Sequence, residues 1–175
     1  MVHLPMRLII LGNIGANVGI APFEELLQPK GVKMKIDISA PLPTPSEVAA
    51  AGLVLSRACY GAAFASGWWI DTDTGEDVRT WPAKYFKLWV GTKIALIHSE
   101  ASEGLEGHRK NKLDDKLPHR SMLEVELADV VIRVADLAGG LGLDLAGAIA
   151  EKLAFNAQRP DHKVENRIQK GGKSY

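Results

Sequence analysis

From Thr44 onward the chain is a series of apolar segments at helical spacing, each ended by glycine or proline. The first segment begins with Thr44-Pro45-Ser46-Glu47, which is a capping box with proline at the first helical position. We therefore expect an all-α, four-helix bundle-like domain with short connections over residues 44–175. Its predicted helices span about 45–66, 83–109, 119–138 and 144–158.

Residues 1–43 lack this helical pattern. Met6–Leu11 is a short apolar run that favours a strand, and a glycine-containing segment, 12–19, follows it. Glycines here could cradle a phosphate, but their spacing matches neither G-x-G-x-x-G nor G-x-x-x-x-G-K-[ST]. A flexible turn is the better interpretation. We therefore expect residues 1–43 to be an irregular N-terminal extension, to which we assign no role.

Composition argues against several classes of protein. Lys plus Arg and Asp plus Glu both number 21, so no basic excess suggests a nucleic-acid partner. Cys59 is the single cysteine, which excludes a disulfide within the chain and disfavours a Cys-based zinc site; its apolar surroundings predict a small core residue. No window approaches the roughly 18 apolar residues of a membrane span, and the apolar run 8–11 is too short for a signal peptide. A cytoplasmic protein without membrane contact is expected.

Two pairs of carboxylates lie on the second and third predicted helices. Glu100 and Glu103 form one pair, and Glu126 and Asp129 the other; a spacing of three residues places both members on one side of their helix. Each pair lies at the shoulder of an apolar stripe, so antiparallel packing through the stripes would gather the four carboxylates at the edge of the core. The stripes are Ile94, Ile97, Ala101 and Leu105 on the second helix, and Leu127, Val130, Val131, Val134 and Ala138 on the third.

Four carboxylates in a small space need a cation, because like charges at close range otherwise force protonation. All-oxygen ligands suit Mg²⁺, the usual ion where phosphates are bound, and Mn²⁺ is its common substitute. The alternative is that both pairs are solvated charges on helix surfaces, since acidic pairs of this spacing are common. Two features favour the metal site: the face of Glu100 and Glu103 also carries Trp89 and Leu96, and both pairs have the same offset from their stripes.

The fourth predicted helix carries Lys152, Asn156 and Arg159 on one face. The two basic side chains could bind phosphate oxygens, and Asn156 could contact a base, a sugar or a phosphate. The alternative is an ordinary basic last turn, which the helix dipole favours. Trp68 and Trp69 follow the first helix, where they either stack on a base or, as is more common, pack in the core or against another subunit.

The acidic pattern E-x-x-E, spacer, E-x-x-D resembles that of all-α nucleoside triphosphate pyrophosphohydrolases of the MazG-like kind. It reads Glu100-Ala101-Ser102-Glu103, then 22 residues, then Glu126-Leu127-Ala128-Asp129. The similarity covers about residues 45–175, and it includes a Lys-x-x-x-Asn-x-x-Arg element and a Gly-Gly-Lys tail in the same order.

The resemblance implies that Glu100, Glu103, Glu126 and Asp129 hold Mg²⁺, which activates a water for attack on the α phosphorus. One glutamate of the second helix, Glu100 in preference to Glu103, would orient or deprotonate that water. The products would be a nucleoside monophosphate and pyrophosphate. Substrate contacts would come from the side chains of Lys152, Asn156, Arg159, Arg109, Lys110 and Lys173.

The resemblance also implies a homodimer or homotetramer, and nucleoside triphosphates as substrates, deoxynucleotides above all. One alternative within the same chemistry is a dedicated dUTP, dCTP or phosphoribosyl-ATP pyrophosphohydrolase. Another is a non-catalytic helical module that binds nucleotides or protein partners. The complete set of four carboxylates favours an enzyme, and dependence on a divalent metal would distinguish the two classes.

Overall fold

The computed structural model describes residues 36–37, 39–169 and 171. These residues contain helices and no strand, so the all-α prediction is confirmed for this part of the chain. The chain divides into two compact units, 1–41 and 42–175, of which the second contains every helix described here. The predicted strand Met6–Leu11, the turn 12–19 and Lys173 lie outside the described residues.

Four long helices make up the second unit. They are α2 (Pro45–Ala65), α3 (Ala83–Lys110), α4 (Met122–Gly140) and α5 (Leu145–Gln158). Shorter elements are the 3₁₀ turns η1 (Val78–Thr80) and η2 (Pro160–His162) and the single-turn helix α6 (Val164–Arg167).

The start of α2 follows the predicted capping box. Thr44 Oγ1 accepts a hydrogen bond from the backbone nitrogen of Glu47 at 3.3 Å, and Glu47 Oε2 accepts one from the backbone nitrogen of Thr44 at 2.7 Å. The start of α4 lies three residues later than predicted, because Ser121, not a residue before it, caps the helix by accepting from Glu124 N at 3.2 Å.

The end of α4 also differs from the prediction. Gly139 and Gly140 remain helical, and the left-handed backbone conformation falls instead on Gly142, whose φ is +67°. Packing explains why glycine is needed inside the helix. A Cβ atom at Gly139 would lie 2.6 Å from Tyr60, and one at Gly140 would lie 1.9 Å from the ring of Trp69.

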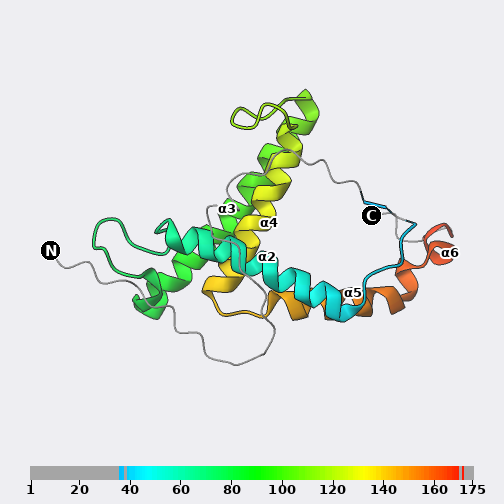
Figure 1. Ribbon diagram of the computed structural model, residues 1–175, viewed down its shortest axis with the longest axis horizontal. Helices are drawn as coiled ribbons and strands as arrows, with labels where there is room; N and C mark the ends of the chain where they lie inside the picture. The colour runs from blue at the N-terminus through cyan, green and yellow to red at the C-terminus, as the bar shows by residue number, and fades with distance from the viewer. Residues whose placement is uncertain (1–35, 38, 170, 172–175) are drawn as a thin grey trace, which may run out of the picture. The chain divides into compact units, whose positions relative to one another are not determined.

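The helices form two crossed antiparallel pairs (Figure 1). Helix α3 pairs with α4, α2 pairs with α5, and α2 also packs across α4. Within the described residues α3 packs against neither α2 nor α5. The four predicted helices are therefore present, but they form an open arrangement in which α4 connects the two pairs.

The core of this unit is small and aromatic. Trp69 is fully buried, and the nearly buried Val78 and Leu137 pack with it. The loop after α2 places Trp69 there by turning back on itself through an antiparallel bridge between Ile70 and Asp77, and the Asp, Thr and Gly residues between them favour such a turn.

The contact between α3 and α4 uses a different face of α3 from the predicted one. The buried residues of α3 are Glu100, Gly104 and Gly107, whereas Ile94, Ala101 and Leu105 of the predicted stripe are exposed. The glycines explain the difference, because they let the two backbones approach closely. On α4, Leu127 and Val131 of the predicted stripe are likewise exposed, while Ala138 is buried and Val130 and Val134 are half-buried.

Helix α2 is more apolar and more exposed than the sequence pattern suggested. By length and composition it is apolar enough to cross a membrane, whereas the sequence predicted no segment that could do so. Only 6% of the residues in its most apolar 18-residue window are buried. Core helices of soluble proteins share this composition, so it does not by itself assign α2 to a membrane. Cys59 is the one buried residue of α2, as predicted for a small core side chain, whereas Leu53, Val54 and Leu55 are exposed.

Candidate functional site

Three of the predicted carboxylates meet between α3 and α4. Glu100 and Glu103 come from α3 and Glu126 from α4, and one oxygen of each lies within 4.8 Å of the others. Glu100 and Glu126 are buried, and Glu103 is exposed at the rim. They line a cavity of about 570 Å³, whose walls are formed by Glu100, Glu103, Asp114, Lys116, Leu117, Val125, Glu126, Asp129 and Arg133.

The close approach of α3 and α4 creates this cluster. A Cβ atom at Gly104 would lie 3.3 Å from Cβ of Glu126, and one at Gly107 would lie 2.8 Å from Cβ of Met122. Side chains of ordinary size at these two positions would hold the helices further apart. The sequence therefore brings the carboxylates together through glycine, not through the apolar stripes.

The electrostatics of the cluster favour protonation. The pKa of Glu126 is raised to about 7, first by burial and then by hydrogen bonding with Glu100 and by the charges of Glu103, Glu100 and Asp129. Burial and the charge of Glu100 also raise the pKa of Asp129, while Arg133 and Lys116 lower it. Glu126 thus binds a proton near neutral pH, and a cation at the same place would favour its ionised form instead.

Arg133 is a site residue that the sequence prediction missed. Its Nε atom donates a hydrogen bond of 2.6 Å to Oε1 of Glu100, and its Nη2 atom lies 2.5 Å from the same oxygen as an ion-pair contact. The side chain of Glu100 is 9% exposed and that of Arg133 is 39% exposed. The sequence could have predicted it, because Arg133 follows Asp129 by four residues and so lies on the same face of α4.

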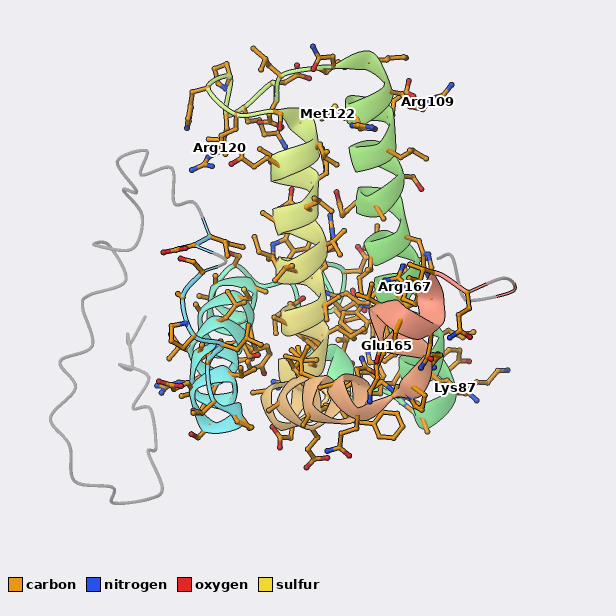
Figure 2. All side chains as sticks on the ribbon, turned by 90° about the vertical axis from the view of Figure 1, so that its right-hand side faces the viewer. Lys87, Arg109, Arg120, Met122, Glu165 and Arg167 are labelled. Carbon is orange, nitrogen blue, oxygen red and sulfur yellow. The ribbon has the colours of Figure 1, made fainter. Side chains whose placement is uncertain are left out.

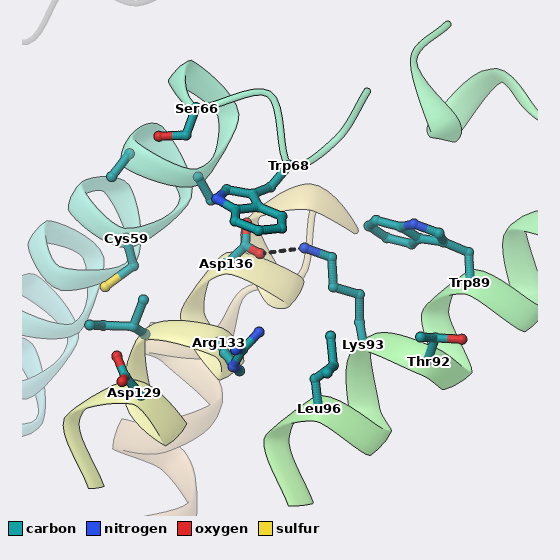
Figure 3. A pocket seen from close by; sticks show the side chains of 13 residues that line it. Cys59, Ser66, Trp68, Trp89, Thr92, Lys93, Leu96, Asp129, Arg133 and Asp136 are labelled. Carbon is teal, nitrogen blue, oxygen red and sulfur yellow. Dashed lines mark hydrogen bonds and ion pairs between the residues drawn. The ribbon is translucent and has the colours of Figure 1, made fainter. Parts of the chain in front are cut away.

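A second cavity, of about 490 Å³, adjoins the first and lies among α2, α3 and α4. Figure 3 shows an ion pair between Lys93 and Asp136 in this cavity, with the rings of Trp68 and Trp89 on either side in that view. Its walls are formed by Cys59, Ala62, Ala63, Ser66, Trp68, Trp89, Thr92, Lys93, Leu96, Asp129, Ile132, Arg133 and Asp136.

Both oxygens of the buried Asp136 carboxylate have partners. Oδ1 accepts from the indole nitrogen of Trp69 at 2.7 Å, and Oδ2 contacts Lys93 Nζ at 3.0 Å. Lys93 Nζ also lies 4.8 Å from the ring centre of Trp89 and 5.1 Å from that of Trp69. Asp136 and Lys93 were missed as well, although Asp136 follows Asp129 by seven residues and Lys93 precedes Glu100 by seven.

The two adjacent tryptophans have different environments. Trp69 is fully buried and belongs to the core, whereas Trp68 is 69% exposed and lines the second cavity. The core interpretation is therefore confirmed for Trp69, whereas the ring of Trp68 is accessible at the wall of the cavity.

The basic face of α5 lies apart from the carboxylates. Lys152, Asn156 and Arg159 line neither of the two cavities, and α5 does not pack on α3. Lys152 Nζ lies 4.9 Å from the ring centre of Phe155, and Arg159 pairs with Asp161 at 2.6 Å. Asn156 Oδ1 is buried and has no hydrogen-bond partner among the residues that the structure describes.

The remaining basic candidates lie at the end of α3. Arg109 and Lys110 both contact Glu106 and line neither cavity. Figure 2 shows Arg109 at the tip of the α3–α4 pair, where Met122 begins α4. Within one chain, the structure thus brings together the four acidic candidates and none of the five described basic or amide candidates.

A comparison of the chain with protein-family models, with curated proteins and with solved structures finds no match in any of the three.

Proposed function

We propose that this chain is a Mg²⁺-dependent pyrophosphohydrolase with the MazG-like fold, which cleaves nucleoside triphosphates, deoxynucleotides above all, between the α and β phosphates. The observation that carries the proposal is the meeting of Glu100, Glu103 and Glu126 from two helices, with one oxygen of each within 4.8 Å of the others. The order and spacing of the four acidic residues, which resemble those of that enzyme family, support the same conclusion.

The donor set fits a hard divalent cation. Glu100, Glu103, Glu126 and Asp129 offer only carboxylate oxygens, which Mg²⁺ prefers and Mn²⁺ accepts. The pKa of Glu126 is raised because burial beside other carboxylates makes its ionised form unfavourable, and a bound cation would offset that cost. When bound, the ion would supply Lewis acidity toward the phosphate and lower the pKa of a water.

The two glutamates of α3 are suited to different tasks. Glu100 is buried and already held by Arg133, so it has the environment of an anchor. Glu103 is exposed and accepts a hydrogen bond from Ser99 Oγ at 3.1 Å, so solvent reaches it. This geometry favours Glu103 as the carboxylate that orients a water and takes its proton, whereas the sequence favoured Glu100.

The second cavity supplies a place for the base. Trp68 and Trp89 offer ring faces for stacking, and the Lys93–Asp136 pair offers a donor and an acceptor at the wall. Because the two cavities share Asp129 and Arg133, a nucleotide with its base in one has its phosphates directed to the other.

The test is turnover by the purified full chain. The protein is incubated with Mg²⁺ and a panel of NTPs and dNTPs, and the products are separated by chromatography. We expect monophosphate and pyrophosphate, abolished by chelator and by Glu103→Gln or Glu126→Gln. Glu106→Gln is the matched control, because Glu106 lies one turn beyond Glu103 on α3, contacts Lys110 and lines neither cavity.

Each other result has a defined meaning. Diphosphate plus phosphate would contradict the assigned bond while keeping a nucleotide hydrolase. Turnover of one deoxypyrimidine nucleotide or of phosphoribosyl-ATP alone would identify a dedicated enzyme. No turnover with any nucleotide and any tested divalent ion would refute catalysis and favour a binding module.

A further inference from the structure

Arg133 occupies the boundary between the two cavities. Among the residues that the structure describes, two line both of them, Asp129 and Arg133. Asp129 is one of the acidic candidates, so Arg133 is the positive charge at the point where a ligand would pass from one cavity to the other. Lys93 lines only the second cavity, and Lys116 lines only the cavity of the carboxylates.

Arg133 contacts the carboxylate of Glu100, which is one of the proposed metal ligands. Its Nε atom donates to Oε1 of Glu100 and its Nη2 atom makes an ion-pair contact with the same single oxygen, so the guanidinium acts as the counterion of that carboxylate. The side chain is 39% exposed, which leaves it room to change rotamer, whereas Glu100 is buried. An arginine fork also matches two oxygens of a phosphate better than it matches one oxygen of a carboxylate.

We propose that Arg133 is a phosphate-binding residue that Glu100 holds in reserve until a divalent cation is bound. This inference rests on the function proposed above. Glu100 attracts Arg133 less once its charge is neutralised by the cation, and the guanidinium is then free to contact phosphate oxygens at the cavity boundary. Cation and phosphate binding should therefore reinforce each other, while Arg133 and the cation compete for Glu100 when no phosphate is present.

Binding measurements on the full chain test this without requiring turnover. The probes are Mg²⁺ alone, inorganic tripolyphosphate in saturating Mg²⁺, and an α,β-methylene deoxynucleoside triphosphate, each titrated by calorimetry. The variants are Arg133→Gln, which removes the charge, and Arg133→Lys, which keeps the charge without the fork. Lys116→Gln is the matched control, because it removes one positive charge from the same cavity, and no ion pair joins Lys116 to Glu100.

We expect Arg133→Gln to bind Mg²⁺ alone as tightly as the unchanged protein or more tightly. It should bind Mg-tripolyphosphate and the methylene analogue about 10- to 100-fold more weakly, the range for loss of a charge-assisted contact. The phosphate affinity of Arg133→Lys should fall between those of the unchanged protein and Arg133→Gln. Lys116→Gln should weaken phosphate binding by less than about threefold, as for an exposed charge. If Arg133→Gln does not fold by circular dichroism, the intermediate loss in Arg133→Lys provides the test.

Three results would overturn the proposal. Equal losses of Mg²⁺ and phosphate affinity in Arg133→Gln would mean that Arg133 only holds Glu100 in place. Equal phosphate losses in Arg133→Gln and Lys116→Gln would mean that cavity charge matters and the position of Arg133 does not. Unchanged phosphate binding in Arg133→Lys and Arg133→Gln would mean that Arg133 does not bind phosphate. Failure of the proposed catalysis is separate, since it appears as absent nucleotide turnover by the unchanged protein while these binding differences persist.

Discussion

The indole nitrogen of Trp69 donates a hydrogen bond of 2.7 Å to Oδ1 of Asp136, which ties the fully buried side chain of the core to a charged group at the wall of a cavity. Lys93 completes the arrangement from α3 by pairing with the other oxygen of Asp136. Core packing and cavity shape therefore depend on the same carboxylate.

Replacement of Asp136 should therefore destabilise the fold strongly. Asp136→Ala leaves the indole of Trp69 and the ammonium of Lys93 without their acceptor, and we expect a loss of about 3–5 kcal/mol in the free energy of unfolding. Denaturant titration followed by tryptophan fluorescence measures it. The double variant Lys93→Met/Asp136→Leu should lose less than Asp136→Ala, because it leaves no unpaired charge; an equal or larger loss would contradict the electrostatic explanation.

Mg²⁺ affinity should depend on pH through Glu126. Its pKa of about 7 lies above the ordinary 4.5, so the neutral form is favoured by folding; this contribution to the stability of the metal-free protein is full below pH 4.5 and is lost as pH rises through about 7. Mg²⁺ requires the ionised form, so its affinity should rise by up to about tenfold per pH unit and level off above pH 7. Asp129, whose pKa is also raised, acts in the same direction.

Calorimetric titrations with Mg²⁺ from pH 5 to pH 8 measure this dependence, and titrations in buffers of different ionisation enthalpy count the protons released. Glu126→Gln should bind Mg²⁺ more weakly and with a flatter pH profile. An affinity that does not change across the range in the unchanged protein would contradict the assignment of Glu126 as a ligand.

Gly140 should not tolerate a side chain. A Cβ atom there would lie 1.9 Å from the ring of Trp69, so Gly140→Ala should destabilise the fold by roughly 1–3 kcal/mol through overpacking. Thermal unfolding measures the change. Gly61→Ala in α2 is the control, because nothing lies within 4 Å of its new Cβ and alanine favours a helix by up to about 1 kcal/mol. Equal effects of the two substitutions would refute the packing argument.

The homodimer or homotetramer implied by the sequence resemblance remains a prediction, and we expect its subunits to meet at the exposed apolar surface of α2. Leu53 and Val54 are 55% and 68% exposed, and an exposed apolar patch is typical of an interaction surface. We expect light scattering to detect an oligomer that Leu53→Glu converts to monomer. Leu113→Glu is the control, since Leu113 is 62% exposed but lies outside the helices. Unchanged mass with Leu53→Glu, or sedimentation with lipid vesicles, would refute this interface.

Because the basic face of α5 lies apart from the carboxylates of its own chain, we expect Lys152 to act, if it contacts substrate, at the site of a partner subunit. Mixing Glu103→Gln with Lys152→Ala should then restore up to about a quarter of the activity in a dimer, because half of the molecules carry one intact site of two. Glu103→Gln mixed with Glu126→Gln should restore none, since both residues belong to one site of one chain. Absence of recovery in the first mixture would exclude Lys152 as a residue acting between subunits.

Local signals in the sequence predicted the helices well, because caps and punctuating residues act over a few positions. Thr44 and Glu47 set the start of α2 through the reciprocal hydrogen bonds of a capping box, which involve only residues three positions apart. The apolar stripe predicted the wrong face of α3 for the contact with α4. Gly104 and Gly107 determine that face, because they let the two backbones approach closely.

The candidate site was partly predictable for the same reason. The spacing of three placed Glu100 beside Glu103 and Glu126 beside Asp129, since helix geometry fixes each pair. The meeting of the two pairs depends on how closely the two helices approach at Gly104 and Gly107. Which of two adjacent tryptophans enters the core depends on the turn around Ile70, and no local pattern encodes that choice.

The glycine at position 104 has a consequence for the choice of ion. For a chain that holds a cation between Glu100 and Glu126, the separation of the two helices sets the radius of the ion that fits, and Gly104 keeps that separation short. Mg²⁺ takes oxygen at about 2.0–2.1 Å and Ca²⁺ at about 2.3–2.6 Å, a difference of a few tenths of an ångström. A methyl group at Gly104 would displace Glu126 by a similar amount, so in such a chain discrimination between these ions by size would depend on a residue that has no side chain and donates no oxygen to the ion.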